Sequence, residues 1–163
     1  MRKRFILVFS LLIFILLSIP VRGQKIEKIK IPELENILKN PDNKLFVVNF
    51  WATWCAPCVK ELPYFEEVSK DYDPDRVQFI LLSLDFPSQI EKQLIPFLKK
   101  NKITLNVSVM MDSDFNSWID KVDSSWQGNI PATLIFNNNK DQRIFFPGEL
   151  DKSGLRKMIN SFL

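Results

Sequence analysis

The chain has 163 residues, of which 46% are hydrophobic and 25% charged, a composition that fits one globular domain with a sizeable core. Four of its 22 basic residues lie in the first 23 positions, and none of its 19 acidic residues does, so the rest of the chain is close to neutral. A near-neutral domain gives no electrostatic basis for binding nucleic acid, and we expect none as a partner.

The first 23 residues have the pattern of a secretory signal peptide. Residues 2–4 are basic, residues 5–19 are almost entirely apolar, and a cleavage site is predicted near Gly23. The apolar run is about 15 residues long, shorter than the roughly 20 that cross a bilayer, and a retained N-terminal anchor is the alternative. We therefore expect residues 24–163 to form a single domain in the periplasm or cell envelope.

The first half of that domain is predicted to contain a strand–helix–strand unit. Apolar residues run almost without interruption in each strand, as expected where a strand is buried on both faces. Between the strands, apolar residues recur every three or four positions, which is typical of a helix, and Pro63 should kink it. The predicted elements are a short helix starting at Pro32, a strand at 45–52, a helix at 56–72 and a parallel strand at 77–84.

The second half is predicted to complete a mixed sheet flanked by helices, in the α/β class. Ser88 and Glu91 form a capping-box pattern at the start of a helix, which Pro96 should bend. Strict alternation at 103–111 predicts a strand with one solvent-exposed face near a sheet edge. The remaining predicted elements are a short helix at 115–122, an antiparallel hairpin of 132–136 with 143–146, and a helix whose apolar stripe is Leu155, Met158, Ile159 and Phe162.

The pentapeptide Trp54–Cys58 carries the strongest chemical signal in the chain. It follows the first apolar strand directly, and it holds the only two cysteines, Cys55 and Cys58. The N–H groups at the start of a helix stabilise a thiolate, and a two-residue spacing lets one sulfur reach the other. A disulfide across so short a loop would add little stability, so the spacing indicates redox chemistry rather than a structural link.

Metal and haem binding are poor explanations of the two cysteines. Zinc takes about four ligands, and the chain contains no histidine and no third cysteine. A c-type haem attachment would need a histidine directly after Cys58, where Val59 stands. We expect no metal and no cofactor.

Two segments resemble the TlpA/ResA-like thioredoxin family of exported thiol-disulfide oxidoreductases. One is Val48–Cys58 with Lys60–Pro63 after it, and the other is Gly128–Phe136, which is similar to the family's cis-proline loop and the strand that follows. In element order the resemblance covers residues 44–163. It implies a thioredoxin-like fold, a central mixed β-sheet flanked by helices, with the dithiol at the start of a kinked helix.

The resemblance also implies roles for individual residues. Cys55 matches the attacking cysteine and Cys58 the resolving one, and together they would form the redox-active disulfide. Four residues match the family's substrate-facing positions, with a cis peptide bond expected at the last of them: Trp54, Pro57, Ile130 and Pro131. Among the other tryptophans, we expect Trp51 in the core, and Trp126 either in the core or beside the dithiol.

Glu61 is the third candidate catalytic residue. It matches an acidic residue that ResA-like members place just past the second cysteine, and it lies three residues after Cys58, on the same helical face. Cytoplasmic thioredoxins have a buried aspartate at the strand position held here by Asn49, and an asparagine cannot take a proton from the resolving thiol. We therefore expect Glu61 to relay that proton. The alternative is an ordinary solvated glutamate on a helix surface.

The function implied is exported reduction of protein disulfides, such as that of apocytochrome c, with a membrane or exported redox partner restoring the dithiol. A disulfide oxidase or isomerase is the near alternative, because sequence does not reveal a reduction potential. A non-catalytic thioredoxin-like binding module is the second alternative. The peroxidase pattern Pro-x-x-x-Thr-x-x-Cys is absent, since its first two positions hold Val48 and Ala52.

Overall fold

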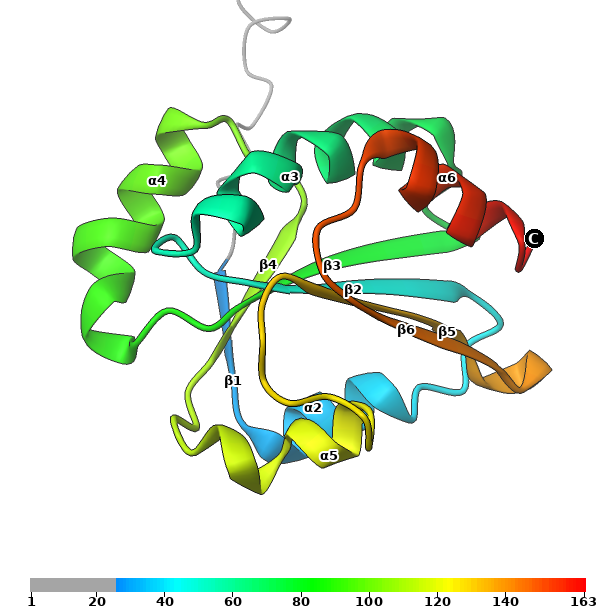
Figure 1. The fold of residues 1–163 in the computed structure, drawn as a ribbon, viewed down its shortest axis with the longest axis horizontal. Helices are drawn as coiled ribbons and strands as arrows, with labels where there is room; N and C mark the ends of the chain where they lie inside the picture. The colour runs from blue at the N-terminus through cyan, green and yellow to red at the C-terminus, as the bar shows by residue number, and fades with distance from the viewer. Residues whose placement is uncertain (1–25) are drawn as a thin grey trace, which may run out of the picture.

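A six-stranded mixed sheet runs through residues 26–163, the part of the chain that this computed structural model describes (Figure 1). The predicted signal peptide or anchor at residues 1–23 lies outside the described residues. The strand order is β1-β4-β3-β2-β5-β6. The first four strands in this order are parallel, β5 is antiparallel to β2, and β6 is antiparallel to β5. The strands are β1 (Ile26–Ile29), β2 (Leu45–Trp51), β3 (Val77–Ser83), β4 (Asn106–Met110), β5 (Ala132–Asn137) and β6 (Gln142–Pro147).

Helices cover both faces of the sheet, which confirms the predicted fold class. The helices α3, α4 and α6 lie over one face, and α2 and α5 lie over the other (Figure 1). No helix within residues 26–163 is both long and apolar enough to cross a membrane. The helices are α2 (Ile31–Leu38), α3 (Ala56–Val68), α4 (Ile95–Lys100), α5 (Ile119–Val122) and α6 (Lys152–Asn160), with 3-10 turns at Ser69–Asp71, Pro87–Gln89, Phe115–Ser117 and Asn138–Lys140 and a π-helical turn at Ile90–Leu94.

Strand β2 is buried along its whole length because both of its faces pack against helices. On one face of the sheet, Val47 and Trp51 pack in the core that α3 and α6 cover. On the opposite face, the core that α2 and α5 cover contains Phe46, Val48 and Phe50. Because β2 and β3 are parallel and in register from end to end, their carboxyl ends meet at the same edge of the sheet. The loops that leave these two strands are therefore neighbours.

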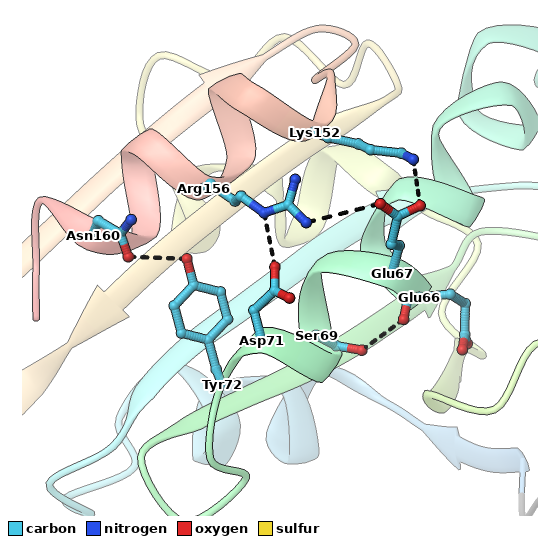
Figure 2. A network of polar contacts seen from close by, with 8 residues as sticks. All are labelled: Glu66, Glu67, Ser69, Asp71, Tyr72, Lys152, Arg156 and Asn160. Atoms are coloured by element: carbon cyan, nitrogen blue, oxygen red, sulfur yellow. Dashed lines mark hydrogen bonds and ion pairs between the residues drawn. The ribbon is translucent and has the colours of Figure 1, made fainter.

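Helix α3 is held on the sheet by an apolar inner face and tied to α6 at its far end. Leu62 and Phe65 are fully buried against the sheet and α6. On the outside, Arg156 Nε donates to Asp71 Oδ2 at 2.7 Å, Lys152 pairs with Glu67, and the Tyr72 hydroxyl donates to Asn160 Oδ1 at 3.0 Å (Figure 2). Exposed pairs of this kind contribute little individually, but together they align the two helices.

The N-terminal edge of the sheet differs from the prediction. Strand β1 was not expected, because residues 24–43 read as polar chain with one short helix. It pairs with β4 in parallel, so β4 is not at the edge. The predicted solvent-exposed face of β4 is also wrong, since Ser108 and Met110 are buried. Met110 packs in the same core as Leu34 of α2, so this helix keeps that side of β4 from water.

The helix expected at 88–98 forms in two pieces. A π-helical turn at Ile90–Leu94 precedes α4, which has Pro96 in its first turn, where a missing N–H is tolerated. The predicted Ser88–Glu91 cap is not the one observed, because Gln89 Oε1 accepts from Phe86 N at 3.0 Å. The helix after Cys55 ends at Val68, earlier than predicted, and continues as a 3-10 turn. The predicted β5–β6 hairpin is confirmed. In the predicted apolar stripe of the last helix, Leu155 and Ile159 are buried, whereas Met158 and Phe162 are partly buried against the same core.

Candidate active site

The two cysteines lie at the connection between β2 and α3. Cys55 is the N-cap residue of α3, and Cys58 lies in its first turn, with Pro57 between them at a position that needs no N–H donor. Their sulfurs form a disulfide with an S–S length of 2.02 Å and a Cα–Cα distance of 5.2 Å. The local fold follows from a buried strand that ends at Trp51 and a helix that begins at Ala56, with four residues between them.

The two sulfurs differ in their surroundings. Cys58 is fully buried, whereas Cys55 keeps 6% of its surface exposed. The backbone N–H of Cys58 donates to Cys55 Sγ at 3.3 Å. A negative charge on Cys55 would therefore be stabilised by this N–H and by the positive end of the helix dipole. The geometry makes Cys55 the sulfur that can meet another molecule.

The loop before β5 closes the site from the opposite side. The peptide bond between Ile130 and Pro131 is cis, as the family resemblance implied, and the Ile130 carbonyl oxygen lies 3.7 Å from Cys55 Sγ. Gly148 N donates to the Pro131 carbonyl at 2.9 Å, which fixes the loop to the end of β6. Gly128 adopts a positive φ of 81°, a conformation that favours glycine. The loop is thus held against the disulfide.

An apolar pocket lies beside the disulfide. Trp54 is half exposed and forms one wall of it, with Leu84, Phe115, Ile119, Trp126, Gly128 and Ile130 forming the rest. The indole N–H of Trp126 donates to the Asn129 carbonyl at 2.8 Å, so this buried ring both supports the loop and lines the pocket. Trp51, in contrast, is fully buried in the core, as predicted.

Glu61 is buried one helical turn after Cys58 and is not a solvated surface residue. Its side chain has no exposed surface, its Oε1 accepts from Asn49 Nδ2 at 2.7 Å, and its Oε2 accepts from Leu150 N at 2.8 Å. Burial raises the pKa of Glu61 to about 7, against the opposing effect of these two hydrogen bonds. A carboxyl group with this pKa can both take and give a proton near neutral pH.

Asn49 links Glu61 to the sheet. Besides its bond to Glu61, its Nδ2 lies 3.2 Å from Thr133 Oγ1 on β5, and both residues are buried. Its Oδ1 is buried without a hydrogen-bond partner among the described residues. Asn49 therefore orients a different acid, Glu61, which lies on α3 one helical turn after Cys58.

Sequence reasoning missed a further acid at the site, Asp85. It lies two residues past the end of β3 and is 1% exposed, and its carboxylate accepts from Thr53 N, Thr53 Oγ1 and Ser83 Oγ. A signal was present, because Asp85 follows a buried parallel strand next to the strand that carries the cysteines. Within residues 26–163, no cluster of three or more histidine, cysteine or acidic side chains is placed to hold a metal ion.

Comparison with known proteins agrees with this arrangement. A model of the AhpC/TSA family matches residues 21–142. Thiol-disulfide oxidoreductase ResA of Bacillus thuringiensis subsp. konkukian (strain 97-27) is 38% identical over 141 residues, which cover 85% of this chain and 69% of that protein. Sporulation thiol-disulfide oxidoreductase A of Bacillus subtilis (strain 168) is 28% identical over 120 residues, covering 68% and 72% of the two chains.

Solved structures support the thioredoxin-like fold. A thioredoxin-related protein from Neisseria meningitidis serogroup B superposes with a TM-score of 0.65 at 22% identity, over 76% of this chain and 88% of that one. StoA from Bacillus subtilis superposes with a TM-score of 0.56 at 22% identity, over 74% and 85%. Taken with the Cys55–Cys58 disulfide at the start of α3, these matches establish that the chain belongs to the thioredoxin-like AhpC/TSA family and is a thiol-disulfide oxidoreductase of the ResA type.

Proposed function

We propose that this protein is exported and reduces disulfides of other proteins through the Cys55–Cys58 dithiol. The observation that carries the proposal is the placement of the disulfide, with Cys55 at the start of α3 and facing the cis-proline loop while Cys58 is buried, one helical turn before the buried Glu61. Cys55 lies where a thiolate would be stabilised, and Cys58 is followed on the same helix by an acid–base group. These are the requirements of two successive exchange steps.

In the first step the Cys55 thiolate attacks one sulfur of the substrate disulfide. A bond forms between Cys55 Sγ and that sulfur, the substrate S–S bond breaks, and the second substrate sulfur leaves as a thiolate that takes a proton from solvent. Trp54, Pro57, Ile130 and Pro131 are proposed to hold the substrate chain during this step. The exposed ring of Trp54 and the position of the Ile130 carbonyl beside Cys55 Sγ support that assignment.

In the second step Cys58 releases the reduced substrate. Its thiol gives a proton to the Glu61 carboxylate, and the resulting thiolate attacks Cys55 Sγ, which forms the Cys55–Cys58 disulfide and breaks the bond to the substrate. Two electrons have then passed from the dithiol to the substrate. A base near Cys58 speeds the step in which the reduced substrate departs, whereas the net direction of electron flow depends on the reduction potentials of the two dithiol–disulfide couples.

The first prediction concerns the two sulfurs. Cys58→Ser should accumulate mixed disulfides between Cys55 and substrate proteins, because the resolving attack is lost, whereas Cys55→Ser should form none. The mixed disulfides are trapped in intact cells, separated on non-reducing gels and identified by mass spectrometry. Apocytochrome c is among the candidate substrates. Equal trapping by both variants, or equal dithiothreitol-driven insulin reduction by Cys55→Ser and the wild type, would favour a binding module.

The second prediction concerns Glu61. In a single-turnover reaction with an aromatic disulfide, the rate of the Cys58 step should rise with pH through about 7, because the ionised form of Glu61 is the base. Glu61→Gln should be slower by about a hundredfold above pH 7 and should lose this inflection. Stopped-flow absorbance at the release of the second aromatic thiol measures the step.

Glu149→Gln is the matched control for Glu61. Glu149 is a nearby, exposed acid whose negative charge raises the pKa of Glu61. Its removal should keep the inflection and move it to lower pH. An inflection that survives in Glu61→Gln while circular dichroism shows a folded protein would remove Glu61 from the proton transfer.

The direction of electron flow is the third prediction. Equilibration with glutathione, read by mass spectrometry of alkylated thiols, should give a reduction potential near the reducing thioredoxin range of about −270 mV. A membrane or exported redox partner would then have to restore the dithiol. A value of about −120 mV would instead assign the protein as an oxidase, since its disulfide would then be the strong oxidant of the pair.

Export is the fourth prediction, and it rests on residues 1–23. A relative described as a secreted Mycobacterium tuberculosis disulfide oxidoreductase has the same fold, with a TM-score of 0.56. In intact cells expressing the full chain with Cys58→Ser, a membrane-impermeant maleimide should label Cys55. Leu12→Lys, which interrupts the apolar run, should abolish the labelling. Equal labelling of both chains only after lysis would contradict export.

A further inference from the structure

Asp85 is a buried acid that the exchange steps do not use. It is 1% exposed, and the salt bridges of residues 26–163 include none to its carboxylate. Burying a carboxylate without a cation is costly unless hydrogen bonds satisfy it. Its donors are Thr53 N, at 3.2 and 3.1 Å from the two oxygens, the Thr53 hydroxyl, and the Ser83 hydroxyl at 2.7 Å.

Thr53 is the midpoint of the turn that places Cys55. Cys55 N donates to the Ala52 carbonyl at 3.1 Å, which closes the turn, and Leu84 N donates to the Trp51 carbonyl at 2.7 Å, which continues the β2–β3 pairing up to it. Beyond that bond the turn leaves the sheet. There the N–H and the hydroxyl of Thr53 both donate to the Asp85 carboxylate, directly before the half-exposed Trp54.

We propose that Asp85 is a positioning residue for disulfide exchange. By holding Thr53, its carboxylate fixes the turn at residues 52–55, which sets the direction of Trp54 and the place of Cys55 Sγ at the start of α3. The proposal rests on the proposed function only in taking Cys55 as the attacking sulfur. Asp85 itself touches neither substrate nor sulfur in this role.

The role is geometric rather than electrostatic. A negative charge near Cys55 would disfavour the thiolate, so Asp85 is not placed there to activate the thiol. An asparagine at position 85 could accept from Thr53 through its oxygen and donate to Ser83 through its nitrogen. A geometric role therefore predicts that Asp85→Asn retains most of the rate, whereas Asp85→Ala does not.

The chain offers a matched control in a second carboxylate that holds a threonine in the same way. Glu66 on α3 accepts from Thr104 N at 2.6 Å and from Thr104 Oγ1 at 2.7 Å, and also from Leu105 N at 2.8 Å. This contact fixes the chain just before β4 begins, at the opposite end of the parallel strands from the cysteines. Glu66→Ala removes the same kind of interaction far from the exchange site.

The experiment measures Cys55 alone, in a Cys58→Ser background, reacting with a small aromatic disulfide across pH. The limiting rate constant at high pH, where Cys55 is fully ionised, reports position, and the midpoint of the profile reports the pKa of the thiol. Asp85→Ala should lower the limiting rate constant about tenfold, because a displaced nucleophile loses its alignment. Glu66→Ala should stay within about twofold of the parent, because that site is remote.

Two further variants keep the test decisive. Asp85→Asn should recover most of the limiting rate constant. Thr53→Val, which removes the hydroxyl and keeps the N–H, should lower it in the same direction as Asp85→Ala and answers the question if Asp85→Ala does not fold. Three results would each overturn the proposal: unchanged limiting rate constants in Asp85→Ala and Thr53→Val, a shift confined to the thiol pKa, or equal losses in Asp85→Ala and Glu66→Ala.

This outcome is separable from that of the proposed function. If the protein did not reduce disulfides at all, the Cys58→Ser parent would trap no substrate, whatever the state of Asp85. If only the positioning proposal were wrong, the parent would react and trap substrates, and the Asp85 variants would match it. Urea denaturation of each variant measures the accompanying loss of folding free energy and shows whether it tracks the rate.

Discussion

The hydrogen bond from Cys58 N to Cys55 Sγ organises the whole site, because it can form only if α3 begins at the residue after Cys55. That start is imposed by β2, which is buried on both faces and ends at Trp51 in the middle of the sheet. The turn between them has little freedom. The parallel partner β3 ends beside it, and the cis-proline loop approaches from the β5 side. The segments that surround the disulfide thus come from the ends of the two strands that neighbour β2, namely β3 and β5.

The inner face of α3 carries a compromise between stability and chemistry. Leu62 and Phe65 contribute to the core, whereas Glu61 places a carboxyl group among them without any exposed surface. Burial of that group is tolerated because Asn49 and Leu150 N donate to its two oxygens. An aliphatic residue would fill the same space at lower cost in folding free energy, but it could not exchange a proton. The geometry therefore favours reactivity over packing at this one position.

The parts of the fold that were predicted are those specified by neighbouring residues. The apolar run of β2, the periodicity of α3 and the β5–β6 turn are local patterns, and the structure contains all three. Strand β1 was missed because only four residues form it and charged residues interrupt its pattern, while its partner β4 is far along the chain. The edge prediction for β4 was wrong for the same reason, since an edge is defined by the strand that does or does not pair beyond it.

The candidate site, too, was only partly predictable from the sequence. The cysteine pair, Pro131 and Glu61 were predicted, but the burial of Glu61 depends on partners 12 and 89 residues away, which no local pattern reveals. Asp85 was not identified because its contact with Thr53 spans 32 residues. The contact of Asp85 depends on the carboxyl ends of β2 and β3 lying side by side, and that of Glu61 on α3 packing over β2 and the chain after β6.

The presence of just one pair of cysteines in this chain has a kinetic consequence for the proposed function. There is no second dithiol to which electrons could be relayed inside the chain, so under that proposal the electron donor and the substrate would dock in turn at the face containing Trp54 and Ile130. Each is then a competitor of the other for the same surface. Turnover under these conditions follows an alternating double-displacement scheme, in which an excess of either participant slows the cycle.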